Sequence, residues 1–189
     1  DDMYNTDISA FLDNMEIIGR TTCPYVVIAP SYMVYTANFD ELLQTHIESG
    51  ADMTLLYHTV DNAKDHFLFC NTLNLNRQKG VLSIKPNRGN AKNRNIFMDT
   101  YVMSKKLFIN LVKEAKKVSS VFTFSDIVDL ACSEIIADTS QLLPISRVIM
   151  TRTFPSLITR MQSAFSMKNG QSTQRQTTLV RLTMWTAPM

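Results

Sequence analysis

Residues 25–60 read YVVIAPSYMVYTANFDELLQTHIESGADMTLLYHTV, and this stretch decides the predicted fold. The apolar run at 25–29 suits a buried parallel strand, and the Pro-Ser pair after it ends the run. The segment 38–50 has apolar residues at helical spacing, polar residues able to cap its start, and a glycine at its end. A second run over 53–60 is rich in apolar and β-branched residues. Strand, helix and strand in this order predict a right-handed parallel crossover.

The flanking residues extend this unit in both directions. A helix is predicted before it, at 6–18. After it we expect two short strands at 67–70 and 81–84, a polar loop at 86–95, a strand at 96–103, and helices at 105–117 and 127–136. This alternation is typical of α/β proteins and predicts an open, mostly parallel sheet. Ligands of such sheets lie beyond the carboxyl ends of strands, which directs attention to residues 30–38 and 84–101.

Composition excludes several classes of protein. Apolar residues make up 45% and charged residues 19% of the chain, as in ordinary globular domains. No run approaches the roughly 20 apolar residues that span a bilayer, and no secretory leader is recognisable. The three cysteines, Cys23, Cys70 and Cys132, are widely spaced and form no CxxC pair. They predict buried thiols in the reducing cytoplasm rather than disulfides or a metal site.

The charge is divided unevenly along the chain. Residues 1–136 contain 13 Lys and Arg against 16 Asp and Glu, whereas residues 137–189 contain six Lys and Arg and a single acid, Asp138. The first part therefore lacks the net positive balance that a nucleic-acid-binding surface needs. The basic second part differs in kind from the first, and it has a separate explanation below.

Three segments between Tyr25 and Glu134 carry a resemblance to a known family: YVVIAPSYMVYTANFDELLQTHIESGADMTLLY, CNTLNLNRQKGVLSIKPNRGNAKNRNIFMDTYVMSKKLFINLV and FSDIVDLACSE. They resemble, in the same order, the accessory (regulatory) subunit of bacterial glucose-1-phosphate adenylyltransferase, or ADP-glucose pyrophosphorylase. The resemblance implies that residues 1–136 are part of a Rossmann-like nucleotide-sugar transferase domain. It also implies that the family's glycine-rich nucleotide loop and its β-helix domain lie outside this sequence, so we expect the chain to be a fragment.

The resemblance also bears on catalysis. Catalytic members have a Gly-Asp pair after the strand that corresponds to residues 26–29, and that Asp holds Mg²⁺ between the nucleotide phosphates. This sequence has Pro30 and Ser31 there, and neither supplies a carboxylate. We therefore expect no catalytic residue, no metal ligand and no cofactor in this chain, although catalytic members use Mg²⁺ and ATP.

Three residues are predicted by the resemblance to contact substrate. The sugar-phosphate motif Glu-Lys-Pro of catalytic members appears as Ile84-Lys85-Pro86, which keeps the lysine. Their Ser-Met-Gly-Ile-Tyr segment appears as Phe97-Met98-Asp99-Thr100-Tyr101, where a bulky ring and a carboxylate would crowd and repel a sugar phosphate. Asp126 lies near the family's second acidic position. The candidate substrate-binding residues are therefore Lys85, Asp99 and Asp126.

Residue types alone point to one further feature, the basic loop with Lys85, Arg88, Lys92 and Arg94. Such a loop could bind an anionic effector or a phosphate group. The alternative is an ordinary solvated loop, and the sequence leaves both open.

Residues 137–189 depart from the family and are predicted to be an out-of-frame, poorly ordered tail. They contain nine Thr, five Arg, five Met and five Gln, without a clear apolar period. The codons of these residues can be read in the frame that starts one nucleotide earlier. In that frame some residue pairs can encode only one amino acid: Met150-Thr151 gives Asp, and Met161-Gln162 gives Ala. With permitted codons elsewhere, the shifted frame can spell a string similar to the linker that follows this domain in the accessory subunits. A divergent but genuine tail is the alternative.

The sequence thus predicts a truncated accessory subunit for ADP-glucose synthesis in glycogen biosynthesis. By implication of the resemblance, it would pair with a catalytic subunit in a cytoplasmic hetero-oligomer and modulate that subunit, without binding nucleic acid or membrane. Two alternatives stay open. One is a catalytic nucleotidyltransferase that forms ADP-glucose from ATP and glucose 1-phosphate, and the other is a non-functional gene remnant.

Overall fold

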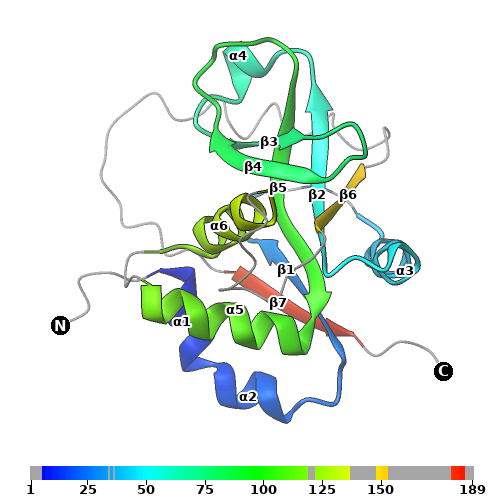
Figure 1. The fold of residues 1–189 in the computed structure, drawn as a ribbon, viewed down its shortest axis with the longest axis vertical. Helices are drawn as coiled ribbons and strands as arrows, with labels where there is room; N and C mark the ends of the chain where they lie inside the picture. Colours follow the sequence, from blue (N-terminus) through cyan, green and yellow to red (C-terminus); the bar gives the residue numbers. More distant parts are fainter. Residues whose placement is uncertain are drawn as a thin grey trace.

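The structure is a computed structural model, shown in Figure 1, that describes residues 6–33, 35, 37–118, 122–136, 148–152 and 180–185. Its elements in chain order are α1 (Asp7–Asp13), α2 (Met15–Arg20), β1 (Tyr25–Pro30), α3 (Phe39–Ser49), β2 (Met53–Val60), α4 (Ala63–His66), β3 (Asn71–Leu75), β4 (Val81–Pro86), β5 (Arg94–Ser104), α5 (Lys105–Val118), α6 (Phe124–Ile136), β6 (Val148–Arg152) and β7 (Val180–Trp185).

The sheet is built around the long strand β5, which crosses the middle of Figure 1. Both β1 and β2 pair antiparallel with β5, through registers that include Val27↔Val102 and Met53↔Met103. The pairs β3–β4, β3–β5 and β1–β7 are also antiparallel. Among the described strands only β2 and β6 pair in parallel. The predicted mostly parallel open sheet is therefore wrong: the protein is α/β, with a predominantly antiparallel sheet.

The reason for this error is the position of β5. Since β1 and β2 both run antiparallel to β5, they run in the same direction as each other, as a crossover requires. They are not neighbours, however, because β5 lies between them and pairs with both. Apolar period and strand propensity do not specify which strand pairs with which, so no local pattern indicates that β5 lies between β1 and β2.

The segment between β2 and β4 also differs from the prediction. Residues 63–66 form the short helix α4, and the strand predicted at 67–70 begins instead at Asn71. The predicted strand falls where the chain turns: Phe69 has a φ of 66°, which strands do not adopt. β3 and β4 then form an antiparallel hairpin, whose turn is held by Asn76 through hydrogen bonds from the Gln78 and Gly80 N–H groups.

Two strands fall within the predicted irregular tail. The backbone of residues 148–152 pairs with β2, and that of residues 180–185 pairs with β1, so the prediction of an irregular tail is wrong for these two segments. The remaining tail residues, 137–147, 153–179 and 186–189, lie outside the described part of the chain. The frameshift and the division at residue 136 stay predictions.

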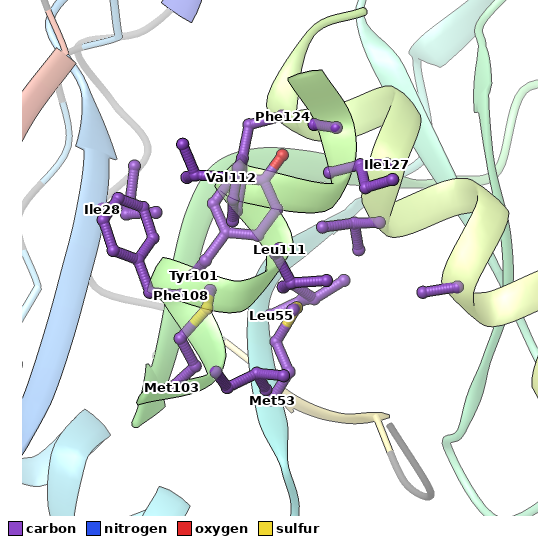
Figure 2. Close-up of a cluster of buried hydrophobic side chains, with 14 of the residues drawn as sticks. Ile28, Met53, Leu55, Tyr101, Met103, Phe108, Leu111, Val112, Phe124 and Ile127 are labelled. Atoms are coloured by element: carbon purple, nitrogen blue, oxygen red, sulfur yellow. The ribbon is translucent and has the colours of Figure 1, made fainter. Parts of the chain in front are cut away.

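Helices cover both faces of the sheet. α1, α5 and α6 pack on one face, where the rings of Phe11, Phe108 and Phe124 meet with centroids 5.1 to 5.8 Å apart. Figure 2 shows part of this core, where the Tyr101 ring from β5 lies among helix side chains that include Phe108 and Phe124. α3 covers the opposite face with Leu42 and Leu43. None of the helices described is both long and apolar enough to cross a lipid bilayer.

Candidate functional site

Lys85 lies on β4 and its amine is held by a carboxylate of the same chain. Lys85 Nζ is 2.8 Å from Asp129 Oδ2 on α6, and the other oxygen of Asp129 accepts the Ile84 N–H at 2.7 Å. Asp129 thus binds both the backbone and the side chain of β4, although the Lys85 side chain is 60% exposed. The lysine that the resemblance assigns to a sugar phosphate is paired with an internal anion.

Asp99 lies on β5 at an irregularity of the β2–β5 ladder. Tyr57 pairs with Phe97 while Leu56 pairs with Thr100, so two residues of β5 are left without partners, and Asp99 takes a φ of 44°. Its Oδ1 atom is buried without a hydrogen-bond partner among the described residues. Burial, and secondarily the charge of Asp7, raise the pKa of Asp99 to about 7. This carboxyl therefore changes its protonation near neutral pH and can accept a further hydrogen bond.

Asp126 lies in the first turn of α6 and is exposed to solvent. Its Oδ2 accepts hydrogen bonds from the Thr123 N–H at 2.9 Å and from the Thr123 hydroxyl at 2.7 Å. A carboxylate at a helix start satisfies local N–H donors and interacts favourably with the helix dipole. These contacts give Asp126 a structural role at the start of α6.

The structure brings Asp99 and Asp126 together around Tyr101, and it adds Asp7, which the sequence analysis missed. Tyr101 is fully enclosed, and its hydroxyl hydrogen-bonds Ser125. Burial first, then the charges of Asp99, Asp7 and Asp126, raise the pKa of Tyr101 well above its usual value. We call Asp7, Asp99 and Asp126 the aspartate cluster around Tyr101. An acid in the first turn of α1 looked like a helix-starting residue, and nothing in the sequence placed it near residues 99 and 126.

The end of β1 has no carboxylate. Ser31, which follows the strand, is exposed and contributes only a hydroxyl. Tyr35, in the loop that follows, reaches across to the hydroxyl of Thr100 on β5, and burial raises the pKa of Tyr35. The two regions that the sequence singled out, 30–38 and 84–101, therefore meet through this hydrogen bond. In the part of the chain that is described, no group of three or more His, Cys, Asp or Glu is placed to hold a metal ion.

A polar hollow of about 250 Å³ lies beside the hairpin, lined by Thr72, Asn74, Lys85, Pro86, Asn87, Arg88, Asn90 and Arg94. We call it the arginine hollow. Its floor is fixed by Asn87, which is buried and whose Nδ2 donates to the carbonyls of Ala63 and Phe67 at 2.6 and 2.8 Å. Lys85 is the one predicted substrate-binding residue at this hollow. Asp99 and Asp126 belong to the separate aspartate cluster around Tyr101.

The comparisons with known proteins give a distant structural likeness. No protein-family model matches the chain. No curated protein matches it either. Among solved structures, the chain is similar to HddC from Yersinia pseudotuberculosis in complex with GMP-PN, with 12% identity and a TM-score of 0.49. The match covers 81% of this chain but only 56% of HddC, so the chain spans little more than half of that protein.

Proposed function

We propose that this chain is an accessory subunit in ADP-glucose synthesis, acting in the cytoplasm on a catalytic glucose-1-phosphate adenylyltransferase subunit for glycogen biosynthesis. The proposal starts from the collinear resemblance of residues 25–134 to that accessory subunit. The observation that carries it is the ion pair between Lys85 and Asp129, at 2.8 Å. A sugar phosphate at Lys85 would compete with a carboxylate that is also bound to the Ile84 N–H.

Two further observations support a role without catalysis. Ser31 stands at the end of β1 where catalytic relatives carry the Asp that holds Mg²⁺, and a hydroxyl is a much weaker ligand for that ion than a carboxylate. Phe97, at the place of the family's Ser near the sugar, is completely buried in the core and presents no hydroxyl to a ligand. Both replacements remove groups that nucleotidyl transfer would need.

The test is reconstitution with a catalytic subunit. The purified chain is mixed with a bacterial catalytic glucose-1-phosphate adenylyltransferase subunit, and complex formation is followed by size-exclusion chromatography with light scattering. ADP-glucose formation from ATP, glucose 1-phosphate and Mg²⁺ is measured with and without the chain, and heat-unfolded chain serves as the control. We expect a mixed complex with altered activity, and no ADP-glucose from the chain alone.

The opposite results separate the alternatives. Formation of ADP-glucose by the chain alone would favour the catalytic nucleotidyltransferase. Absence of both product and complex, with a folded chain, would contradict the accessory role and favour a gene remnant.

A further inference from the structure

We propose that the arginine hollow is a binding site for a phosphate group, formed by Arg88 and Arg94 and distinct from the Lys85–Asp129 pair. The starting observation is a buried donor without a partner. Arg94 Nε is buried, and no described residue accepts a hydrogen bond from it. Leaving such a donor unpaired is unfavourable, and nearly all buried donors in native proteins have an acceptor. Because Arg94 lines the hollow, a turn of its side chain would bring this donor within reach of an acceptor oxygen of a ligand there.

The charge of the hollow indicates an anionic ligand. Its lining includes the cations Arg88, Arg94 and Lys85 but no carboxylate among the described residues. Lys85 is neutralised by Asp129, which lies outside the lining, whereas neither arginine has an ion pair within the described chain. Two unpaired guanidinium groups in one hollow repel each other, and a dianion between them removes that repulsion.

The shape and size of the hollow favour a single phosphate group. Guanidinium presents its N–H donors in a planar fork that matches two phosphate oxygens at once. A volume of about 250 Å³ lies below the roughly 300–1,000 Å³ of pockets that enclose drug-sized ligands. The lining is polar, with amides at Asn74 and Asn90 and no aromatic ring on which a base could stack. These features fit inorganic phosphate or the phosphate end of a small phosphate ester.

The loop is held in place before any ligand binds. Asn87 uses all of its polar atoms internally, since its Oδ1 accepts the Gly89 N–H at 3.0 Å while its Nδ2 binds two carbonyls. Gly89 has a φ of 73°, and a Cβ there would lie 2.9 Å from the Leu68 side chain, so the turn depends on glycine. Arg88, next to both, is therefore presented from a defined turn, and Arg94 from the start of β5. A site fixed in advance loses less conformational entropy on binding.

Nuclear magnetic resonance of the ¹⁵N-labelled full chain tests the proposal. Inorganic phosphate, glycerol phosphate and, for ionic strength, sodium chloride are titrated separately. The backbone amide of Gly89 and the Arg94 Nε–H are the reporters, and the exposed Arg77 is the internal control. We expect a saturable shift of both reporters with phosphate and none with chloride. Tighter binding of glycerol phosphate would identify an organic phosphate ester as the ligand, and equal binding would indicate that the phosphate group alone is recognised.

Three variants complete the test, with the Gly89 amide as the reporter. Arg88→Gln on the exposed loop removes one charge-assisted contact and is expected to weaken phosphate binding about tenfold. Arg94→Lys keeps the charge but not the fork, and should weaken it to a similar extent. Arg77→Gln, on the exposed hairpin turn and outside the lining of the hollow, is expected to leave binding within about twofold. Shifts that chloride reproduces, or binding that Arg88→Gln leaves as strong as Arg77→Gln does, would overturn the proposal.

Discussion

The carboxylate of Asp7 accepts the backbone N–H of Phe124, at 3.0 and 3.1 Å, across 117 residues of sequence. One oxygen also accepts the N–H of Ile8 at 2.9 Å, so a single side chain joins the start of α1 to the start of α6. Burial is the main cause that raises the pKa of Asp7, and the nearby charge of Asp126 adds to it. Asp7 therefore joins α1 to α6, the two helices that carry Asp7 and Asp126 of the aspartate cluster around Tyr101.

Replacement of Asp7 should separate its hydrogen bonds from its charge. We expect Asp7→Ala to lower the free energy of unfolding by about 1–3 kcal/mol, because it leaves the Phe124 N–H without an acceptor. Asp7→Asn keeps one acceptor oxygen and removes a carboxylate that burial disfavours, so it should stay within about 1 kcal/mol of the parent protein. Urea unfolding measures both, and hydrogen exchange of the Phe124 amide should accelerate in Asp7→Ala alone. Equal losses in both variants would contradict this account.

Asp99 predicts a pH-dependent stability. Its pKa is about 7 in the folded chain against a usual value of 3.8, so between these values the folded state holds the proton more tightly than the unfolded state. Stability from this residue is then greatest below pH 4 and falls as the pH rises through 7, by on the order of 4 kcal/mol. Asp99→Asn should abolish this fall and stabilise the protein at pH 8 with little effect at pH 4.5. Asparagine also tolerates the positive φ.

Urea midpoints at the two pH values measure the effect, and Asp40→Asn on the exposed first turn of α3 is the matched control. If Asp99→Asn and the parent protein lost stability equally between pH 4.5 and 8, the buried carboxyl would not be its source.

The Lys85–Asp129 pair predicts unequal effects of its two members. Lys85→Met should change the free energy of unfolding by less than about 1 kcal/mol, because the amine is largely exposed and such ion pairs contribute little. Asp129→Ala should cost about 1–3 kcal/mol, because it also removes the acceptor for the Ile84 N–H. Thermal unfolding of both variants checks the ranking, with Lys117→Met in the exposed Lys117–Glu114 pair as the control. A reversed order would show that the backbone contact is unimportant.

Asn87 predicts a stability effect at the loop of the arginine hollow. Asn87→Ala removes two donor contacts to carbonyls and one acceptor contact to the Gly89 N–H, so we expect a loss of about 2–4 kcal/mol. Asn93→Ala, an exposed position nearby, should change stability by less than about 0.5 kcal/mol. Urea unfolding compares the two, and similar midpoints for both variants would argue against a fixed loop.

The aromatic cluster predicts a large loss on truncation. The Phe124 ring is 1% exposed and lies 5.1 Å from the Tyr101 ring centroid and 5.6 Å from that of Phe11. Phe124→Ala should cost about 3–5 kcal/mol, as large-to-small changes at buried aromatic residues do. Phe69, which is 84% exposed, provides the matched control, and Phe69→Ala should change the unfolding midpoint little. Retention of full stability by Phe124→Ala would place the core elsewhere.

The sequence predicted those features that depend on neighbouring residues. The runs at 25–29 and 53–60 became β1 and β2, and the amphipathic segment 105–117 became α5, because local apolar period determines such elements. The pairing of β5 between β1 and β2 depends on contacts between residues 34 to 79 positions apart, such as Val60 with Arg94 and Tyr25 with Ser104, which no local pattern encodes. The same holds for Lys85 with Asp129 and for Asp7 with Phe124. Residue type identified the charged side chains, but only the fold shows which of them neutralise each other.

The place of β5 also determines when this sheet can form during synthesis. β1 and β2 emerge from the ribosome first, yet every described strand that pairs with either of them, β5, β6 or β7, is encoded later. Until β5 is translated, these two apolar strands have no described partner strand, although the helices α1, α2 and α3 are already present and can cover part of them. A nascent chain paused before residue 94 therefore exposes two unpaired apolar strands, the kind of surface to which chaperones bind and through which chains aggregate.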